Sequence, residues 1–177
     1  MISDFVKGKK KFDYAEGIQK GIMLHRAIDA YTDEHPATKQ GKQYLKPAVG
    51  LYAGAFVDVV YDHFLALDKN QFLQQTLLQH TSNTHQTLQL YQQVLPPVFQ
   101  QMLPYMIAQN WLFNYQYTWG IERSFGGVAR RAKYIDSSVT VFALFEKHYH
   151  ALQECYNAFF PDVKAFTLYQ IQLFEKA

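Results

Sequence analysis

The fold is decided by the stretch Ala55-Phe-Val-Asp58-Val-Val-Tyr-Asp62-His63-Phe-Leu-Ala-Leu67. Apart from Asp58, Asp62 and His63, its side chains are apolar or aromatic, and it contains neither glycine nor proline. The apolar residues do not alternate with polar ones, so the pattern indicates a helix and not a strand. A helix that is apolar on almost every side lies inside a protein. The stretch therefore predicts a central, mostly buried helix in an all-α protein.

A membrane span is the first alternative for this region, because the residues from Val49 to Leu67 are the most apolar part of the chain. A bilayer-spanning helix would bury Asp58 and Asp62 in hydrocarbon at a cost of several kcal/mol. The sequence also lacks a positively charged start followed by an apolar run, so we expect no signal peptide. The single cysteine, Cys155, cannot form an internal disulfide and suits a reducing compartment. We expect a soluble, cytoplasmic protein with no membrane insertion.

The composition is that of a folded domain. The 177 residues are enough for one domain with a sizeable core and few for two, so we expect one domain over residues 1–177. A hydrophobic fraction of 49% and an aromatic fraction of 16% exclude a disordered chain. The net charge of +2, from 17 basic and 15 acidic residues, does not point to nucleic acid as a partner.

Helical periodicity continues on both sides of the central stretch. No segment alternates like a strand, and prolines and glycines fall mostly at segment edges. We therefore predict a single-domain, all-α bundle of about eight helices with short connections. The expected helical segments are 15–31, 36–46, a helix from Pro47 to Leu67, 71–79, 82–94, one from Pro97 to near Asn114, a short helix around Gly120 to Arg131, one from Asp136 or Ser137 to near Phe159, and a last one from Pro161.

The two carboxylates of the central helix, Asp58 and Asp62, are four residues apart and therefore lie on one face, one turn above the other. Like charges at this spacing destabilise a helix, and they do so more strongly when desolvated. A bound divalent cation offsets the repulsion, because hard oxygen ligands on adjacent turns can share a metal. The alternative is that both carboxylates face solvent or pair with arginines. We favour the metal site because the helix around them is so apolar.

A second pair of possible ligands, His25 and Asp29, is also four residues apart on a predicted helix. A neutral imidazole and a carboxylate at this spacing can bind one metal, or Asp29 can fix the tautomer of His25. Arg26 points about one hundred degrees away from His25 and could meet a phosphate or the carboxylates. The alternative is an ordinary surface pair. Together with Asp58 and Asp62 on a facing helix, the pair predicts a mixed histidine and carboxylate metal site.

Basic residues gather in two places. Lys9 to Lys11 follow Asp4, which alone would be a helix cap, and Arg130, Arg131 and Lys133 follow a pair of glycines. Each cluster is either a solvated helix end or an anion-binding patch, and the spacing does not decide between them. Glycine-rich phosphate loops, nucleophile elbows and zinc-type cysteine spacings have no support in the sequence.

Several blocks of the sequence share their order and spacing with one protein family. The most specific are Asp4-Phe-Val-Lys-Gly8, Leu24-His25-Arg26-Ala-Ile-Asp29 with Thr32-Asp33, and Asp58-Val-Val-Tyr-Asp62-His63-Phe-Leu65. Looser matches follow at Trp111-Leu112, Tyr115, Gly127-Val-Ala-Arg130-Arg131 and Phe159-Phe-Pro161. Over almost the whole chain, these residues resemble the bacterial acyl carrier protein phosphodiesterases.

This resemblance implies an activity, a cofactor and a set of site residues. Such enzymes hydrolyse the phosphodiester that joins 4′-phosphopantetheine to a serine of holo-acyl carrier protein, depend on manganese, and are distant relatives of the all-helical HD-type phosphohydrolases. The usual His-Asp pair of HD enzymes stands here in reverse order, as Asp62-His63, so we favour carboxylates as ligands. By position, the resemblance implies Asp4, His25, Asp58 and Asp62 as metal ligands, and His63, Asp29 and Arg26 as catalytic, orienting or phosphate-contacting residues.

Three hypotheses follow. The first is a metal-assisted phosphodiesterase acting on holo-acyl carrier protein, in which the metal activates water and His63 or Asp29 assists proton transfer. Arg26, Arg130 or Arg131 would offset the charge of the phosphate, and the lysines at Lys9 to Lys11 and from Lys39 to Lys46 would guide the acidic carrier protein. The second keeps the metal but acts on a nucleotide or another phosphodiester. The third is a non-catalytic helical module that binds an acidic partner through its basic patches.

Overall fold

The computed structural model describes residues 2–71, 74–132, 135 and 138–176, and in these ranges the chain is helical with no strand, which confirms the all-α prediction. The described residues form nine α-helices, against the eight or so expected. In chain order these are α1 (Glu16–Glu34), α2 (Pro36–Val49), α3 (Ala53–Leu67), α4 (Gln74–Leu90), α5 (Pro97–Ala108), α6 (Trp111–Asn114), α7 (Thr118–Arg131), α8 (Val139–Lys147) and α9 (Tyr149–Lys176). Short 3-10 helices are η1 (Ser3–Phe5), η2 (Gly8–Asp13), η3 (Gly50–Tyr52) and η4 (Gln92–Val94).

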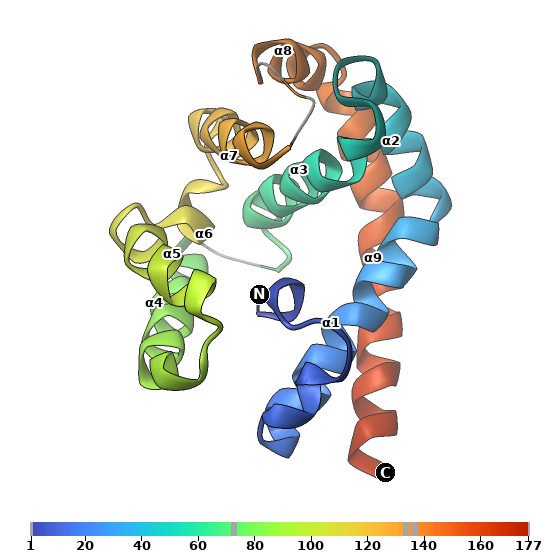
Figure 1. Ribbon diagram of the computed structural model, residues 1–177. Coiled ribbons are helices and arrows are strands. Elements are labelled where there is room, and N and C mark those ends of the chain that lie inside the picture. Colours follow the sequence, from blue (N-terminus) through green and yellow to red (C-terminus); the bar gives the residue numbers. More distant parts are fainter. Residues whose placement is uncertain (1, 72–73, 133–134, 136–137, 177) are drawn as a thin grey trace.

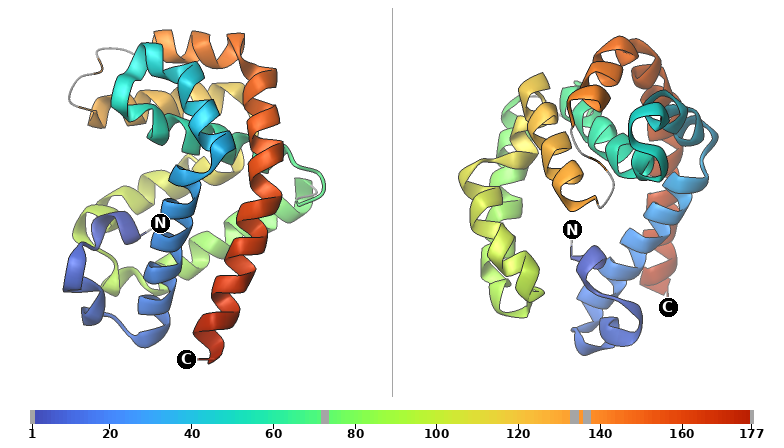
Figure 2. Two further views of the ribbon diagram at one scale, coloured as in Figure 1. Left: turned by 90° about the vertical axis from the view of Figure 1, so that its right-hand side faces the viewer. Right: turned by 45° about the horizontal axis from the view of Figure 1, so that its top comes forward.

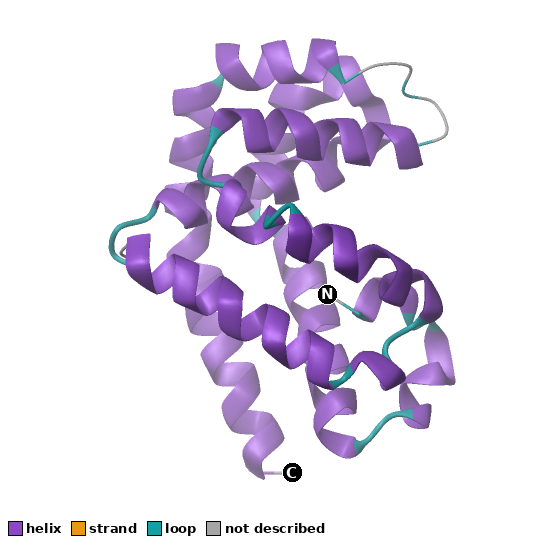
Figure 3. Cartoon of the chain, turned by 90° about the vertical axis from the view of Figure 1, so that its left-hand side faces the viewer, coloured by secondary structure: helices purple, strands orange, loops and turns teal. Residues whose placement is uncertain are grey.

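The helices form two parts. We call α1, α2, α3, α7, α8 and α9 the main bundle, and α4 with α5 the side unit. Helices α1 and α2 lie one after the other along α9, the longest helix (Figure 1, Figure 2). Helices α3 and α8 pack on α2, and α7 packs on α3. Helices α4 and α5 lie on the side opposite α9 and are joined to the rest through α6, which contacts α4, α5 and α7 (Figure 1, Figure 3).

Two hydrophobic clusters of different size hold these parts together. The larger one fills the space between α2, α3, α7, α8 and α9, and the side chains at its centre are fully buried. Burying side chains of this size supplies most of the free energy that stabilises such a bundle. The smaller cluster belongs to α5 and the residues just before it. The fully buried members of the larger cluster are Leu45, Phe56, Val57, Val60, Ile121, Phe125, Val141, Phe145 and Leu152, and the smaller cluster consists of Leu95, Phe99, Leu103 and Met106.

The N-terminal segment joins the main bundle to the side unit formed by α4 and α5. Ile2 and Phe5 pack on the α5 cluster, and the Phe5 ring meets Phe99 edge to face with ring centroids 5.7 Å apart. On the other side η1 and η2 contact α1, where the Arg26 guanidinium donates a hydrogen bond to the backbone carbonyl of Val6. The segment is therefore fastened at both ends, and Asp4 lies between the two anchors.

Two proline positions show where the predicted helix boundaries are wrong. Pro47 lies inside α2, which continues to Val49 and ends at Gly50 with φ of 54°, and Pro161 lies inside α9. Proline normally starts or breaks a helix, because it lacks a donor and its ring meets the preceding turn. Here the residues on both sides of each proline are needed in the core. The buried flanking residues are Leu45 and Val49 around Pro47, and Phe159 and Val163 around Pro161.

Other predicted segments fuse or divide. The segments 71–79 and 82–94 are one helix, α4, followed by η4, and the predicted helix from Pro97 to Asn114 is broken by Asn110, which has a left-handed φ of 44°. The short helix predicted around Gly120 to Arg131 is α7, which begins two residues earlier, at Thr118. The capping residues proposed at 136 and 137 and the basic residue at 133 lie outside the described residues.

One continuous helical stretch, Pro36–Leu67, is long and apolar enough to cross a membrane by length and composition alone. It is divided among α2, η3 and α3, and half of its most apolar window is buried inside the protein. The core helices of a bundle pass the same test, so the stretch is accounted for by its packing against the rest of the chain.

Candidate active site

Helix α3 is buried on most of its circumference and exposed along one narrow stripe. Ala55, Asp58 and Asp62 are exposed, at spacings of three and four residues, while the residues between them are buried. This arrangement confirms the predicted placement of the two carboxylates on one face of an apolar helix. Within the described residues, neither carboxylate forms an ion pair with a lysine or arginine, so pairing with arginines has no support, while their exposure agrees with the alternative that both face solvent.

A second group of potential ligands lies on α1 and η1. Atoms of Asp4, His25 and Asp29 that could bind a metal all lie within 4.8 Å of one another. The Nδ1 atom of His25 is 2.9 Å from a carboxylate oxygen of Asp29, so the pair predicted from the spacing is formed. This contact leaves the Nε2 atom of His25 for another partner. The fastening of the N-terminal segment to Arg26 and α5 is what brings Asp4 to this group.

The two groups act on each other electrostatically. Burial raises the pKa of Asp58 to about 6, and the nearby charges of Asp33, Asp29 and Asp4 add to the rise, while Lys42 opposes it. Burial raises the pKa of Asp62 to about 7, with the charge of Asp58 as a further cause. Both residues are also exposed to solvent. We call Asp4, His25, Asp29, Asp58 and Asp62 the acidic cluster.

Among the described residues, the atoms close enough to share a metal are those of Asp4, His25 and Asp29, and Asp58 and Asp62 are not among them. The chemistry of the group suits a divalent metal. Carboxylate oxygens and an imidazole nitrogen are common ligands of manganese, zinc and similar ions. Like charges crowded in one place, without lysine or arginine partners among the described residues, are stabilised by a cation. Lys42, the nearest basic side chain to act on Asp58, is already bound to Asp33 at 2.7 Å. The structure places Asp29 among the ligand candidates, one of the two roles that its spacing from His25 allowed, whereas the resemblance implied a catalytic or orienting role.

His63 lies elsewhere, although it follows Asp62 directly. It is 1% exposed, its Nδ1 atom is 2.6 Å from the backbone carbonyl of Tyr115, and its Nε2 atom is 2.9 Å from the hydroxyl of Tyr149. A carbonyl can only accept, so Nδ1 carries the proton and Nε2 accepts from Tyr149. Burial lowers the pKa of His63, which keeps the ring neutral. With both nitrogens engaged inside the core, His63 joins α3 to α6 and α9 and does not reach the acidic cluster.

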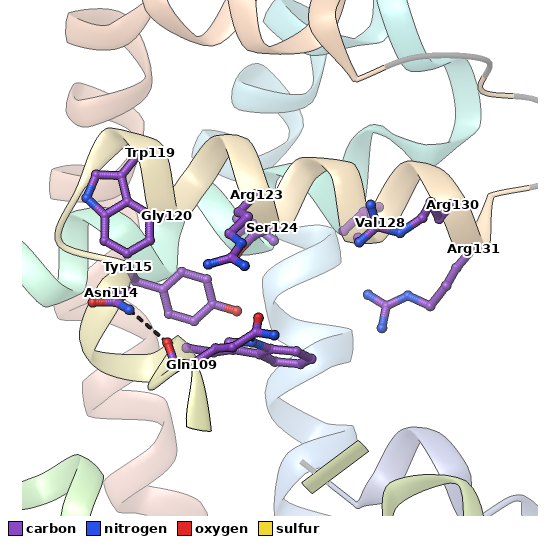
Figure 4. Close-up of a pocket in the computed structure, with 13 residues that line it drawn as sticks. Gln109, Asn114, Tyr115, Trp119, Gly120, Arg123, Ser124, Val128, Arg130 and Arg131 are labelled. Carbon is purple, nitrogen blue, oxygen red and sulfur yellow. Dashed lines mark hydrogen bonds between the residues drawn. The ribbon is translucent and has the colours of Figure 1, made fainter. Parts of the chain in front are cut away.

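A pocket of about 380 Å³ lies beside α3, which contributes Val59 to its lining, and is otherwise formed mainly by α6, α7 and the residues that flank α6. Three arginines line it, Arg123, Arg130 and Arg131, and none of them forms an ion pair within the part of the chain that the structure describes. Figure 4 shows these arginines along α7, with Tyr115 and Gln109 directed into the same space. We call this the arginine pocket. Its further lining residues are Val59, Trp111, Asn114, Trp119, Gly120, Ser124, Gly127 and Val128.

Tyr115 connects the arginine pocket to the acidic cluster. Burial raises the pKa of its hydroxyl, the charge of Asp62 raises it further, and the charge of Arg131 lowers it. The Tyr115 side chain is therefore close enough to both groups to feel both charges. An anion with a phosphoryl group could meet the arginines and a metal at the acidic cluster at the same time.

Arg130 and Arg131 thus lie where an anion-binding patch requires them, while Arg26 is engaged with the N-terminal segment. Arg123 and Gln109 were not predicted from the sequence, and Tyr115 stood out there only as one of the residues shared with the family. Arg123 is two helical turns before Arg130, so recognition of α7 as one helix would have placed the two on one face. Gln109 carries no signal in the sequence, since its place depends on the break at Asn110.

The comparisons with known proteins identify the family of the chain. The sequence model described as acyl carrier protein phosphodiesterase matches residues 1–163 of the chain. Similar proteins of that name include those of Enterobacter sp. (strain 638) and Yersinia pestis, each 28% identical over 91% of this chain and 84% of their own length. The one of Serratia proteamaculans (strain 568) is 29% identical over 92% of this chain and 85% of its own. No solved structure matches the chain. The family indicated by the sequence blocks is confirmed, and the chain belongs to the acyl carrier protein phosphodiesterase family.

Proposed function

We propose that the protein is a metal-dependent phosphodiesterase that hydrolyses the bond between 4′-phosphopantetheine and a serine of holo-acyl carrier protein. The family supports an acyl carrier protein phosphodiesterase. The single observation that carries the metal dependence is the approach of Asp4, His25 and Asp29 to within 4.8 Å of one another, beside Asp58 and Asp62. The compartment we propose is the cytoplasm, where the single cysteine would stay reduced.

In this proposal Asp4, His25 and Asp29 hold a divalent metal, manganese by resemblance, and Asp58 and Asp62 face the same space as further ligands. A bound metal supplies Lewis-acid activation of the phosphoryl group and of water. Asp29 also orients the His25 ring through its contact with Nδ1. Arg130 and Arg131 bind the phosphate from the α7 side, which offsets charge in the transition state. His63 keeps α3 in place and has no direct part in the reaction.

The carrier protein would be drawn to the site by charge. The arginine pocket and the lysines of η2 are basic surfaces. An acidic partner is attracted to such surfaces over distances of about 8 Å at physiological salt.

The proposed function is tested by incubating holo-acyl carrier protein with the enzyme and manganese, and measuring the carrier by mass spectrometry. We expect the mass to fall by that of the phosphopantetheine group, and Asp62→Ala to abolish the change while its helical circular dichroism stays that of the wild type. Unchanged turnover by Asp62→Ala would refute the role of the acidic cluster. Hydrolysis of nucleotides instead of the carrier would favour another phosphodiester as substrate, and a melting temperature that manganese does not shift would favour a non-catalytic module.

A further inference from the structure

The arginine pocket has two ends of different chemistry. At one end Arg130 and Arg131 stand at the C-terminal end of α7. At the other end Gln109, Trp111, Asn114 and Trp119 come from α6 and its flanking turns. In Figure 4 the labelled members of the second group lie at the opposite end of α7 from the two arginines. A ligand that fills the pocket would therefore be long, with an anion at one end and groups that suit amides and indole rings at the other.

The amide side chains at this second end are held in fixed orientations with part of their hydrogen-bonding capacity unused. Trp111 Nε1 donates to the Gln109 side-chain oxygen at 3.0 Å, and the Asn114 side-chain nitrogen donates to the Gln109 backbone carbonyl at 2.8 Å. The Gln109 side-chain NH₂ group keeps its donors, and the Asn114 side-chain oxygen keeps its acceptor sites. One donor and one acceptor are what a secondary amide needs from its surroundings.

The substrate of the proposed function has matching chemistry. The pantetheine arm carries a phosphate at one end and two secondary amides along its length. Its chain of about thirteen bonds spans about 15 Å when extended, at the 3.3–3.6 Å per three bonds of an extended chain. Gly120 and Arg131, at the two ends of the pocket face of α7, are separated by about 16 Å at 1.5 Å per residue. The length of the pocket face therefore suits the arm.

We propose that the arginine pocket binds the 4′-phosphopantetheine arm, with the phosphate at Arg130 and Arg131 and the amides at Gln109 and Asn114. The proposal rests on the proposed function, since that function supplies the substrate. Tyr115, which feels the charges of both Asp62 and Arg131, lies beside Asn114 and Trp119 in Figure 4, with its hydroxyl directed along α7 toward the arginines. Gln109 and Asn114 are positioning residues: they hold the arm and do not touch the bond that breaks.

A second pocket, of about 270 Å³, is the competing site for the arm. It lies between α1 and the end of α4, and reaches His25 of the acidic cluster. Its walls are almost entirely apolar, for example Ile18, Ile22 and Leu88, so the arm's amides would lose their hydrogen bonds to water without replacement. The arginine pocket is favoured because it replaces them.

Glycines allow each pocket to be filled without disturbing the core. Gly127 lines the arginine pocket and Gly21 the apolar pocket. A side chain on Gly21 would have no other atom within 4 Å of its Cβ, and one on Gly127 would have only the Arg130 guanidinium, at 3.9 Å. Both positions are helical, so Gly127→Leu and Gly21→Leu should fold at least as well as the wild type. They form a matched pair of blocking variants.

The experiment is a titration with 4′-phosphopantetheine, followed by tryptophan fluorescence. Trp111 and Trp119 are the two tryptophans of the protein, and both line the arginine pocket. We expect saturable binding by the wild type and at least ten-fold weaker binding of inorganic phosphate. Gly127→Leu should weaken phosphopantetheine binding at least ten-fold, and Gln109→Ala about five-fold, the value of one hydrogen bond. Gly21→Leu should bind as the wild type does.

Two results would overturn the assignment: wild-type affinity in both Gly127→Leu and Gln109→Ala, or loss of binding in Gly21→Leu alone. The carrier assay separates this proposal from the proposed function. If the wild type hydrolyses holo-carrier protein and Gly127→Leu does so with the same KM, the proposed function is supported and the assignment of the arginine pocket is wrong. If the wild type does not hydrolyse holo-carrier protein but the variants bind phosphopantetheine as expected, the pocket assignment is supported and the proposed function is wrong.

Discussion

The acidic cluster and the arginine pocket each include residues of α3, hold opposite charges and are built in different ways. The acidic cluster takes its residues from three separate segments, η1, α1 and α3, while the arginine pocket comes mostly from one continuous stretch, Gln109–Arg131. In both regions, like charges stand together without ion-pair partners among the described residues beyond the contact of His25 with Asp29. The acidic cluster therefore lacks a neutralising cation, and the arginine pocket lacks a neutralising anion. A bound metal and a bound phosphate group would supply the two.

The largest effect should come from removing a ligand of the acidic cluster. His25→Ala should lower the rate of phosphopantetheine release on the order of 10²–10³-fold, the usual loss when one preorganised electrostatic group is removed. The rate is measured with saturating manganese and holo-carrier protein. His150→Ala, on the exposed side of α9, is the matched control and should keep full activity. Equal activity in both variants would mean that His25 contributes no more to the reaction than the exposed His150, which would contradict its role as a ligand.

The next effect belongs to the arginine pocket. Arg131→Ala should raise the KM for holo-carrier protein by about 10–100-fold, because a charge-assisted hydrogen bond to phosphate contributes about 1.5–3 kcal/mol. Arg131→Lys should recover part of the loss, since it keeps the charge without the planar fork. Steady-state kinetics measure both. A change in manganese affinity without any change in KM would show that Arg131 serves the acidic cluster and not the substrate.

The shape of the arginine pocket depends on a close approach between α6 and α7. A Cβ atom on Gly120 would lie 2.0 Å from the backbone oxygen of Asn114, which no side chain can tolerate. Gly120→Ala should therefore destabilise the protein by about 1–3 kcal/mol, the usual cost of overpacking. Gly127→Ala, in the same helix, should be neutral or stabilising by up to about 1 kcal/mol. Urea denaturation compares the two, and equal stabilities would contradict the tight contact.

The smallest effect is a pH dependence of stability in the metal-free protein. The pKa of Asp58 is raised to about 6 in the folded protein. Between pH 4 and pH 6 the unfolded chain has lost this proton and the folded chain retains it, so stability falls as pH rises through this window. At pH 8 in chelator, Asp58→Asn should be more stable than the wild type by about 1 kcal/mol, after allowance for solvent screening. At pH 4 the gain should vanish.

Manganese provides the control for this prediction. In the wild type at pH 8, the metal should restore stability by neutralising the carboxylates, so that the advantage of Asp58→Asn disappears. An advantage that persists unchanged in manganese would mean that the metal does not bind near Asp58.

Much of the site could be predicted from the sequence, because helical spacing alone puts Asp58 over Asp62 and His25 over Asp29. The place of His63 could have been inferred as well, since it is about 100° around the helix from Asp62 and falls on the buried side. The approach of Asp4 to His25 and Asp29 could not, because it depends on Phe5 packing against Phe99, far along the chain. The likeness to HD-type enzymes and the identity of the metal stay predictions.

The all-α fold class could be predicted from the same helical periodicity. Several predicted helix boundaries were wrong, each because of packing or backbone conformation at one position. Pro47 and Pro161 were expected to start helices, yet buried residues on both sides of each proline keep α2 and α9 continuous. The break at Asn110 was missed, and with it the position of Gln109. Core packing outweighs the cost of about 3 kcal/mol that a proline imposes in a helix interior, and that balance is not visible in a sequence.

The central claim is that the acidic cluster binds a divalent metal through Asp4, His25 and Asp29. The most direct measurement is a calorimetric titration of manganese into the metal-free wild type and into the double variant Asp4→Asn with His25→Ala. The account predicts saturable binding by the wild type and at least a hundred-fold weaker binding by the double variant, while both show the same helical circular dichroism. Equal manganese affinity in the two proteins would contradict it.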